Sequence, residues 1–106
     1  MKIIYPLKKT AVKPGEIPTI DQLTQPREVR RETPQGLRLA AIGAPSNFEG
    51  NLYMRQHYDF FDTRPELMDG ISRQANAAAA KLGEMKHAAI LLMCEAHNEI
   101  KSEQRR

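Results

Sequence analysis

The sequence predicts a mainly α-helical chain, in which an extended, proline-rich amino-terminal arm precedes a short helix and a long, heptad-patterned carboxy-terminal helix, arranged as a hairpin or bundle. Three observations lead to this fold class. Prolines crowd the first 45 residues, helix-capping patterns follow, and apolar residues then recur at alternating steps of three and four. We therefore divide the 106 residues into an arm over 1–45 and a helical segment over 46–106.

Proline spacing rules out a long helix in the arm. Six of the seven prolines lie there, at Pro6, Pro14, Pro18, Pro26, Pro34 and Pro45. Each removes a backbone donor and biases the preceding residue towards extended geometry. Two short helical turns remain compatible: one capped by Thr19 with Gln22, and one starting at Pro26 and covering residues 27–32. Residues 36–42 form either a strand or a docking segment.

Separated apolar residues distinguish the arm from an ordinary disordered linker, which is usually poorer in such residues. We interpret them as anchors that insert one by one into a neighbouring protein. The alternative is that they cover the chain's own helices. The anchors are Ile4, Tyr5, Leu7, Ile17, Ile20, Leu23, Leu37, Leu39 and Ile42.

Two helices are predicted after the arm. Ser46 and Glu49 fit an S-x-x-E capping box, which predicts a helix over residues 47–61 that holds five of the six aromatic residues. Thr63 and Glu66 form a second box, with Pro65 in the first turn, and predict a helix over 64–101.

The predicted second helix carries a heptad repeat of apolar residues over four cycles. Its members are Met68, Ile71, Ala75, Ala78, Leu82, Met85, Ala89, Leu92 and Ala96. We predict a helix-packing interface along them, within a homo-oligomer or a multi-helix bundle. The alternative is packing against the predicted first helix, which is too short to cover even half of the second. Gly83 either weakens this helix or ends it.

Charge provides the basis for a second functional hypothesis. The net charge is +3 and the isoelectric point about 9.2, and residues 1–45 carry eight basic against four acidic residues. Possible phosphate contacts in a small regulatory nucleic-acid-binding protein are Lys8, Lys9, Lys13, Arg27, Arg30 and Arg31. Glu28 and Glu32 interrupt this group, and Tyr5 is the arm's only aromatic residue, so a base-stacking platform is missing.

No residue set in the sequence indicates catalysis. Cys94, His87 and His97 are too few for a zinc site, and the apolar run around Cys94 argues against a reactive thiol. The carboxylates Glu49, Asp59, Asp62, Glu66 and Asp69 are explained by capping or by solvent exposure. Motifs such as a phosphate-binding loop or HExxH are missing. We therefore expect no enzymatic activity, no cofactor and no metal.

The sequence therefore favours a non-catalytic structural or adaptor subunit of a larger assembly, for example a virion or secretion-machine component. We expect it to oligomerise through the carboxy-terminal helix and to wrap a neighbour with the arm, so its partners would be itself and at least one larger subunit. The amino terminus does not resemble a signal peptide, and the longest apolar run, Ala88–Cys94, is too short to span a bilayer. We expect a cytoplasmic protein or one within a soluble assembly.

Overall fold

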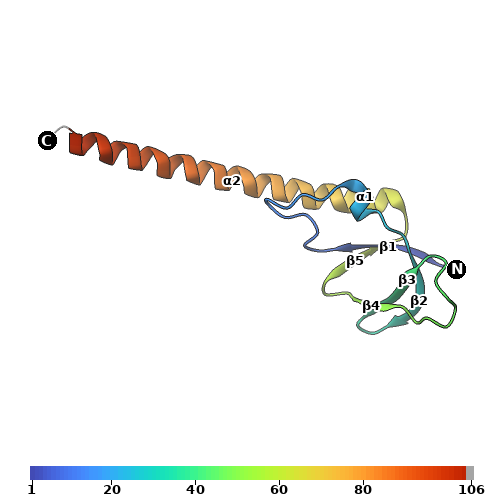
Figure 1. The fold of residues 1–106 in the computed structure, drawn as a ribbon. Helices are drawn as coiled ribbons and strands as arrows, with labels where there is room; N and C mark the ends of the chain where they lie inside the picture. Colours follow the sequence, from blue (N-terminus) through green and yellow to red (C-terminus); the bar gives the residue numbers. More distant parts are fainter. Residues whose placement is uncertain (105–106) are drawn as a thin grey trace.

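The computed structural model describes residues 1–104, which form five strands, one short helix and one long helix (Figure 1). In chain order these are β1 (Ile3–Lys8), α1 (Ile20–Leu23), β2 (Arg27–Thr33), β3 (Gly36–Ala41), β4 (Asn51–Met54), β5 (Tyr58–Phe61) and α2 (Arg64–Gln104). We call residues 1–63, which contain the sheet and α1, the head. Helix α2 starts against the head and then extends away from it as a rod.

The five strands form one antiparallel sheet in the order β4-β3-β2-β1-β5. Strand β1 is shared between two neighbours: Ile3 and Ile4 pair with β2, whereas residues 5–8 pair with β5. Pro6 lies beyond the part of β1 that pairs with β2. Pairing with β2 therefore does not depend on the backbone N–H group that proline lacks. Strand β1 therefore joins the two halves of the sheet.

The sheet is curled, because its two outer strands follow one another directly in the chain. Strands β4 and β5 are joined by residues 55–57, and the His57 amide donates to the Met54 carbonyl in this turn at 3.0 Å. Such a short turn can connect β4 to β5 only if the sheet bends until the ends of these two outer strands lie next to each other. The rings of Tyr53 and Tyr58 pack edge to face across this junction, with centroids 4.8 Å apart.

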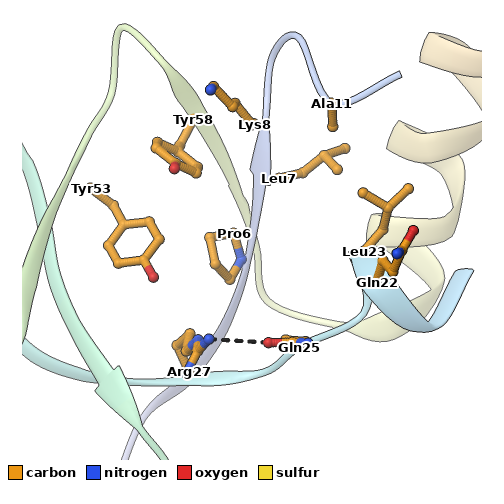
Figure 2. Close-up of a pocket in the computed structure, with 10 residues that line it drawn as sticks. All are labelled: Pro6, Leu7, Lys8, Ala11, Gln22, Leu23, Gln25, Arg27, Tyr53 and Tyr58. Atoms are coloured by element: carbon orange, nitrogen blue, oxygen red, sulfur yellow. Dashed lines mark hydrogen bonds between the residues drawn. The ribbon is translucent and has the colours of Figure 1, made fainter. Parts of the chain in front are cut away.

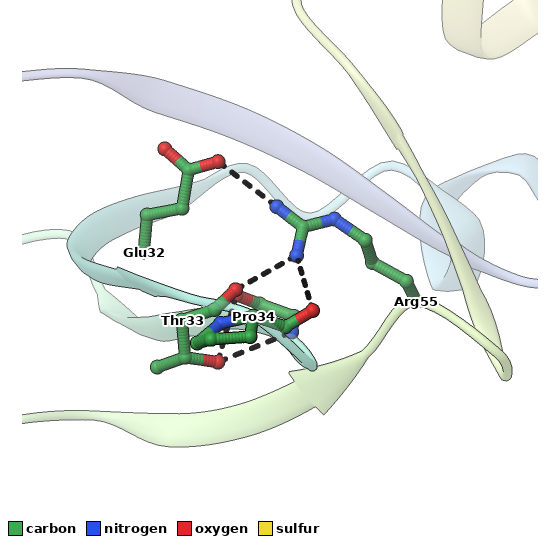
Figure 3. Close-up of polar contacts among 5 residues, drawn as sticks. Glu32, Thr33, Pro34 and Arg55 are labelled. Carbon is green, nitrogen blue, oxygen red and sulfur yellow. Dashed lines mark hydrogen bonds and ion pairs between the residues drawn. The ribbon is translucent and has the colours of Figure 1, made fainter.

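Arg55 fastens this turn to the neighbouring hairpin (Figure 3). Its guanidinium donates to the carbonyl oxygens of Thr33 and Pro34 at 2.8 and 3.3 Å and pairs with Glu32 at 2.9 Å. The Arg55 amide also donates to the Gln35 carbonyl at 2.8 Å. The ion pair is exposed and contributes little by itself. The contacts with backbone carbonyls fix the position of the β4–β5 turn against the β2–β3 turn.

The main core lies between β1 and the start of α2. Leu7, Leu67 and Ile71 are almost fully buried and contact one another. Partly buried residues surround them, namely Tyr5, Ala11, Leu23, Phe61 and Met68. Leu67 and Ile71 are four residues apart and therefore lie on the same face of α2. That face holds the helix on the sheet.

Gln74 extends this attachment along the helix by binding backbone. Its side-chain amide donates to the Lys8 carbonyl at 2.9 Å and accepts from the Val12 amide at 3.1 Å. The loop after β1 is thereby tied to α2, and it runs beside the helix in Figure 1. Ala78, one turn further on, is buried. Contact between α2 and the head therefore reaches about residue 78.

The predicted mainly α-helical fold class is wrong, since residues 1–45 form β1, α1, β2 and β3 rather than an extended arm. The prolines mark loops: five of the six in this region lie between elements, and Pro6 alone lies within a strand. The capping box of Thr19 and Gln22 is confirmed in α1. The second helical turn, over residues 27–32, is instead strand β2, which pairs along its length with β3.

The helix predicted over residues 47–61 is also wrong, because this region forms β4 and β5. Gly50 has φ +81°, which a helix does not permit, and its carbonyl accepts from Arg38 at 3.0 Å. The aromatic residues that suggested a helical face are equally typical of strands. A helical hairpin is therefore excluded. Helix α2 begins at Arg64, as expected, and continues through Gly83 to Gln104.

Substitution by alanine should have opposite effects on stability at the two glycines of helix α2, Gly70 and Gly83. A Cβ at Gly70 would lie 2.6 Å from the Phe61 ring, whereas a Cβ at Gly83 meets nothing within 4 Å. We expect Gly70→Ala to destabilise the fold by about 1–2 kcal/mol, since the ring must shift. Gly83→Ala should stabilise α2 by about 1 kcal/mol. Thermal unfolding followed by circular dichroism measures both, and shifts of the same sign would contradict the packing at Gly70.

Candidate interaction surface on helix α2

Beyond Ala78, the head no longer covers the side chains of helix α2. Every residue from 79 to 102 is exposed. We call this stretch the distal segment. At 41 residues, α2 is about 61 Å long, and the molecule measures 79 × 24 × 21 Å. The radius of gyration is 21.8 Å, against about 13 Å for a compact domain of this size.

The distal segment is rich in exposed apolar side chains. Seven of the thirteen large hydrophobic residues that are exposed in the described chain lie on it: Leu82, Met85, Ile90, Leu91, Leu92, Met93 and Ile100. Leu92 is 67% exposed and Met85 54%. Contiguous exposed apolar surface on a protein usually marks a place where another molecule binds.

The structure divides the nine heptad residues into two groups. Ile71 and Ala78 are buried and Met68 is partly buried, so this part of the repeat packs within the chain. Ala75 lies beside them but is exposed. The remaining five, Leu82, Met85, Ala89, Leu92 and Ala96, are all exposed, and we call them the distal seam. The repeat thus serves the head first and then continues onto a free helix.

The total accessible surface is larger than that of a compact chain. The chain exposes 7903 Å², whereas a compact monomer of its mass exposes about 6,000 Å². The excess, about 1,900 Å², exceeds the ~800 Å² that one partner contributes to a protein interface of standard size. The projecting helix accounts for this excess, because it is the part of the chain without neighbours.

Charges on the distal segment balance. It carries Lys81, Lys86 and Lys101 against Glu84, Glu95 and Glu99. Lys81 and Glu84 form an exposed ion pair at 3.6 Å. A neutral segment of this kind can approach a copy of itself without net repulsion.

The predicted arm anchors mostly belong to the head's own interior. Ile4, Leu7 and Leu39 are buried there, and Tyr5, Leu23 and Leu37 are partly buried. Ile17, Ile20 and Ile42 are exposed. The interpretation as an arm that wraps a neighbour is therefore wrong, because the residues meant to bind a partner build the sheet's own packing.

The six basic residues singled out for phosphate are partly engaged within the head. Arg30 donates to the Ala44 carbonyl at 2.9 Å and lies 3.7 Å from Glu28, with its side chain 14% exposed. Arg27 donates to the Gln25 side chain at 3.1 Å. Lys8, Lys9, Lys13 and Arg31 are exposed. The nucleic-acid hypothesis stays a prediction, and no contact in the structure favours it.

A small cavity on the head is lined by residues of β1, β2, β4, β5 and α1 (Figure 2). Its volume is about 180 Å³. Among the residues that line it, Tyr53, Tyr58 and Pro6 lie on one side of strand β1, and Leu7 and Leu23 lie on the other. It is smaller than the ~300 Å³ at which pockets for small organic ligands usually begin. Leu7 already serves the core, so the cavity is a gap beside that core.

Groups considered for chemistry are dispersed. Cys94, His87 and His97 are all exposed on α2, and within the described residues no three histidine, cysteine or acidic side chains gather as a metal site would require. The Asp69 carboxylate pairs with Arg73 at 2.6 Å one turn along the helix. The Thr63 hydroxyl accepts from the Glu66 amide at 3.3 Å, as capping predicts. Asp59 lies in β5, and Glu49 in the loop before β4.

Two polar residues that shape this arrangement carry no signal in the sequence. Gln74 and Arg55 act on backbone groups of residues distant in the chain, such as Lys8 and Thr33. No local pattern identifies such partners. The exposed seam, by contrast, follows from a repeat that is visible in the sequence.

Comparison with protein families, curated proteins and solved structures finds no match to this chain. Among the described residues, none of the helices is at once long and apolar enough to cross a membrane.

Exposure of the distal segment predicts the behaviour of the single cysteine. Cys94 lies on the side of α2 that faces away from the distal seam. It is two residues from both Leu92 and Ala96, and two residues correspond to a rotation of about 200° around a helix. We expect its thiol to react with a disulfide reagent at close to the rate of an unfolded control peptide, both in dilute protein and when the seam is covered by one partner helix. A thiol at least tenfold slower would contradict its exposure.

Proposed function

We propose that this chain is a non-catalytic subunit of a protein assembly, which it joins through the distal segment of α2. The single observation that supports this proposal is the distal seam, five exposed heptad residues that continue the stripe by which the start of the same helix packs on the head. The head anchors the helix, and the helix presents the seam.

The physical argument starts from the cost of leaving the seam in water. Large side chains such as Leu82, Met85 and Leu92 each gain about 1.5–3 kcal/mol on full burial. Most of the stability of a helix in a protein comes from the packing of its apolar face, which the distal segment lacks, and Gly83 weakens the segment further. Association would remove both penalties, because it buries the seam and holds the helix.

The alternating residue sizes suit close helix packing. Alanines at positions 89 and 96 alternate with Met85 and Leu92, so a partner helix can approach the small residues while the large ones fill space beside them. The arrangement is typical of interfaces between helices, whereas an enzyme site needs convergent polar groups. The earlier idea of a wrapping arm has no place in this proposal.

A pair of lysine substitutions in the seam tests the proposal. We expect the purified wild-type chain to have a mass that is a multiple of 12.0 kDa by light scattering during size-exclusion chromatography. The variant Leu82→Lys/Leu92→Lys should be a monomer, because two charges would have to be buried in the interface. Its head should unfold at the same temperature as wild type, since neither leucine touches the head core.

Leu91→Lys is the matched control. Leu91 is 52% exposed and next to Leu92 in the chain, but it lies on the opposite side of the helix from most of the seam. It should retain the wild-type mass. A wild-type chain that stays monomeric at high concentration, or a double variant with unchanged mass, would overturn the proposal. If Leu91→Lys were also a monomer, any added charge on the helix would be enough to prevent association.

A further inference from the structure

The distal seam and the face that packs on the head are the same side of one helix. A helix turns about 100° per residue, so Leu67, Ile71, Ala78 and the distal seam fall within a sector of about 80°. The helix is continuous from Arg64 to Gln104. The head therefore stands on the side from which a partner must approach the seam.

This geometry blocks parallel pairing. In a parallel, in-register pair the two heads would both lie between the two helices, at the same end. Packed helices lie about 8–10 Å apart, whereas the molecule is 21–24 Å across its short axes. Two heads cannot occupy that gap beside straight helices. An antiparallel pair avoids the conflict, because each head then lies beyond the carboxy-terminal end of the partner's helix.

The length of the free helix also fits antiparallel pairing. Residues 79–104 span about 39 Å. Two such segments can overlap along this whole length before either helix end reaches the partner's head. In the register that sets Met85 opposite the partner's Ala96, residue 102 lies opposite residue 79 and the last residue of the helix, Gln104, lies opposite residue 77. The overlap therefore covers the free segment and ends where the head begins to cover α2.

In the same arrangement, the seam residues of the two copies complement each other in size, and the flanking residues complement each other in charge. That register sets Leu92 opposite Ala89 and Met85 opposite Ala96, so each large residue of these layers meets a small one. Lys81 immediately precedes Leu82, and Glu95 immediately precedes Ala96, so the two charges lie on one flank of the seam. Antiparallel pairing brings the lysine end of that flank towards the glutamate end of the partner's, whereas parallel pairing turns this flank towards the partner's other flank, where Lys81 would face Lys86.

We infer that the occupant of the distal seam is a second copy of this chain, bound antiparallel, so that two heads stand at opposite ends of a two-helix rod. This inference rests on the proposed function and adds the partner's identity and direction. The excess exposed surface of about 1,900 Å² per chain is ample for the ~800 Å² that each partner of a stable dimer buries.

Distance between two spin labels tests the direction. Ser102→Cys in a Cys94→Ser background places one label per chain near the helix end, where residue 102 is exposed. The mass of the labelled chain is measured first by light scattering. Double electron–electron resonance should then give about 35 Å between labels in the antiparallel register, whereas labels about 10 Å apart in a parallel pair would broaden the continuous-wave spectrum.

A dimer with the long distance supports the inference. A dimer with labels about 10 Å apart overturns the antiparallel direction while the proposed function stands, and a trimer does the same. A chain that remains monomeric overturns both. Disulfide formation gives a second measure: in the Cys94→Ser background, Met85→Cys mixed with Ala96→Cys should cross-link on oxidation, and Leu82→Cys alone should not.

Discussion

The attachment of α2 to strand β1 determines the shape of this protein. Leu7 meets Leu67 and Ile71 in a core of few residues, and Gln74 continues the attachment by binding the backbone on either side of the loop after β1. Because these contacts end near Ala78, the remaining helix is supported only at its base. The direction in which it projects, and the side on which its apolar residues lie, are both fixed by this attachment.

Because the attachment ends near Ala78, the heptad repeat is longer than the stretch of α2 that the head covers. A helix that packs on a sheet needs apolar residues on one face, at steps of three and four, and so does a helix that packs on another helix. Leu67 and Ile71 satisfy the first need, and the exposed seam residues from Leu82 to Ala96 continue the same stripe, with no break in the helix between them. One stripe therefore carries both the residues that pack on the head and the exposed distal seam, and the relative orientation of the two groups is set by the pitch of the helix.

Helix α2 could be predicted from the sequence, while the sheet could not. Thr63, Pro65 and the heptad are local signals, and they place the start of α2 at the correct residue. The strands depend on pairing between residues far apart, such as Tyr5 with Phe61 and Ile3 with Glu28. Charged residues also interrupt β2, so its apolar alternation is weak.

The prolines and a capping-like pattern explain why the sequence predicts helices and an arm where the structure has strands. Spaced prolines indicated an extended arm, although in the structure they mainly separate short elements. Ser46 and Glu49 matched a helix start, but Gly50 then takes a conformation that ends any helix. For the candidate surface, the seam residues were visible in the repeat. Which of them the head covers was not, since that depends on the tertiary contact with β1.

The curl of the sheet has a consequence for how selective association can be. Open sheet edges offer unpaired backbone groups to any other strand and are a common route to aggregation. Here the two outer strands, β4 and β5, are joined by a short turn and drawn together by Tyr53 and Tyr58, and Arg55 holds that turn in place. The head therefore brings the ends of its two edge strands together at this turn. Exposed side chains on a helix can discriminate between partners in a way that backbone pairing at a free strand edge cannot.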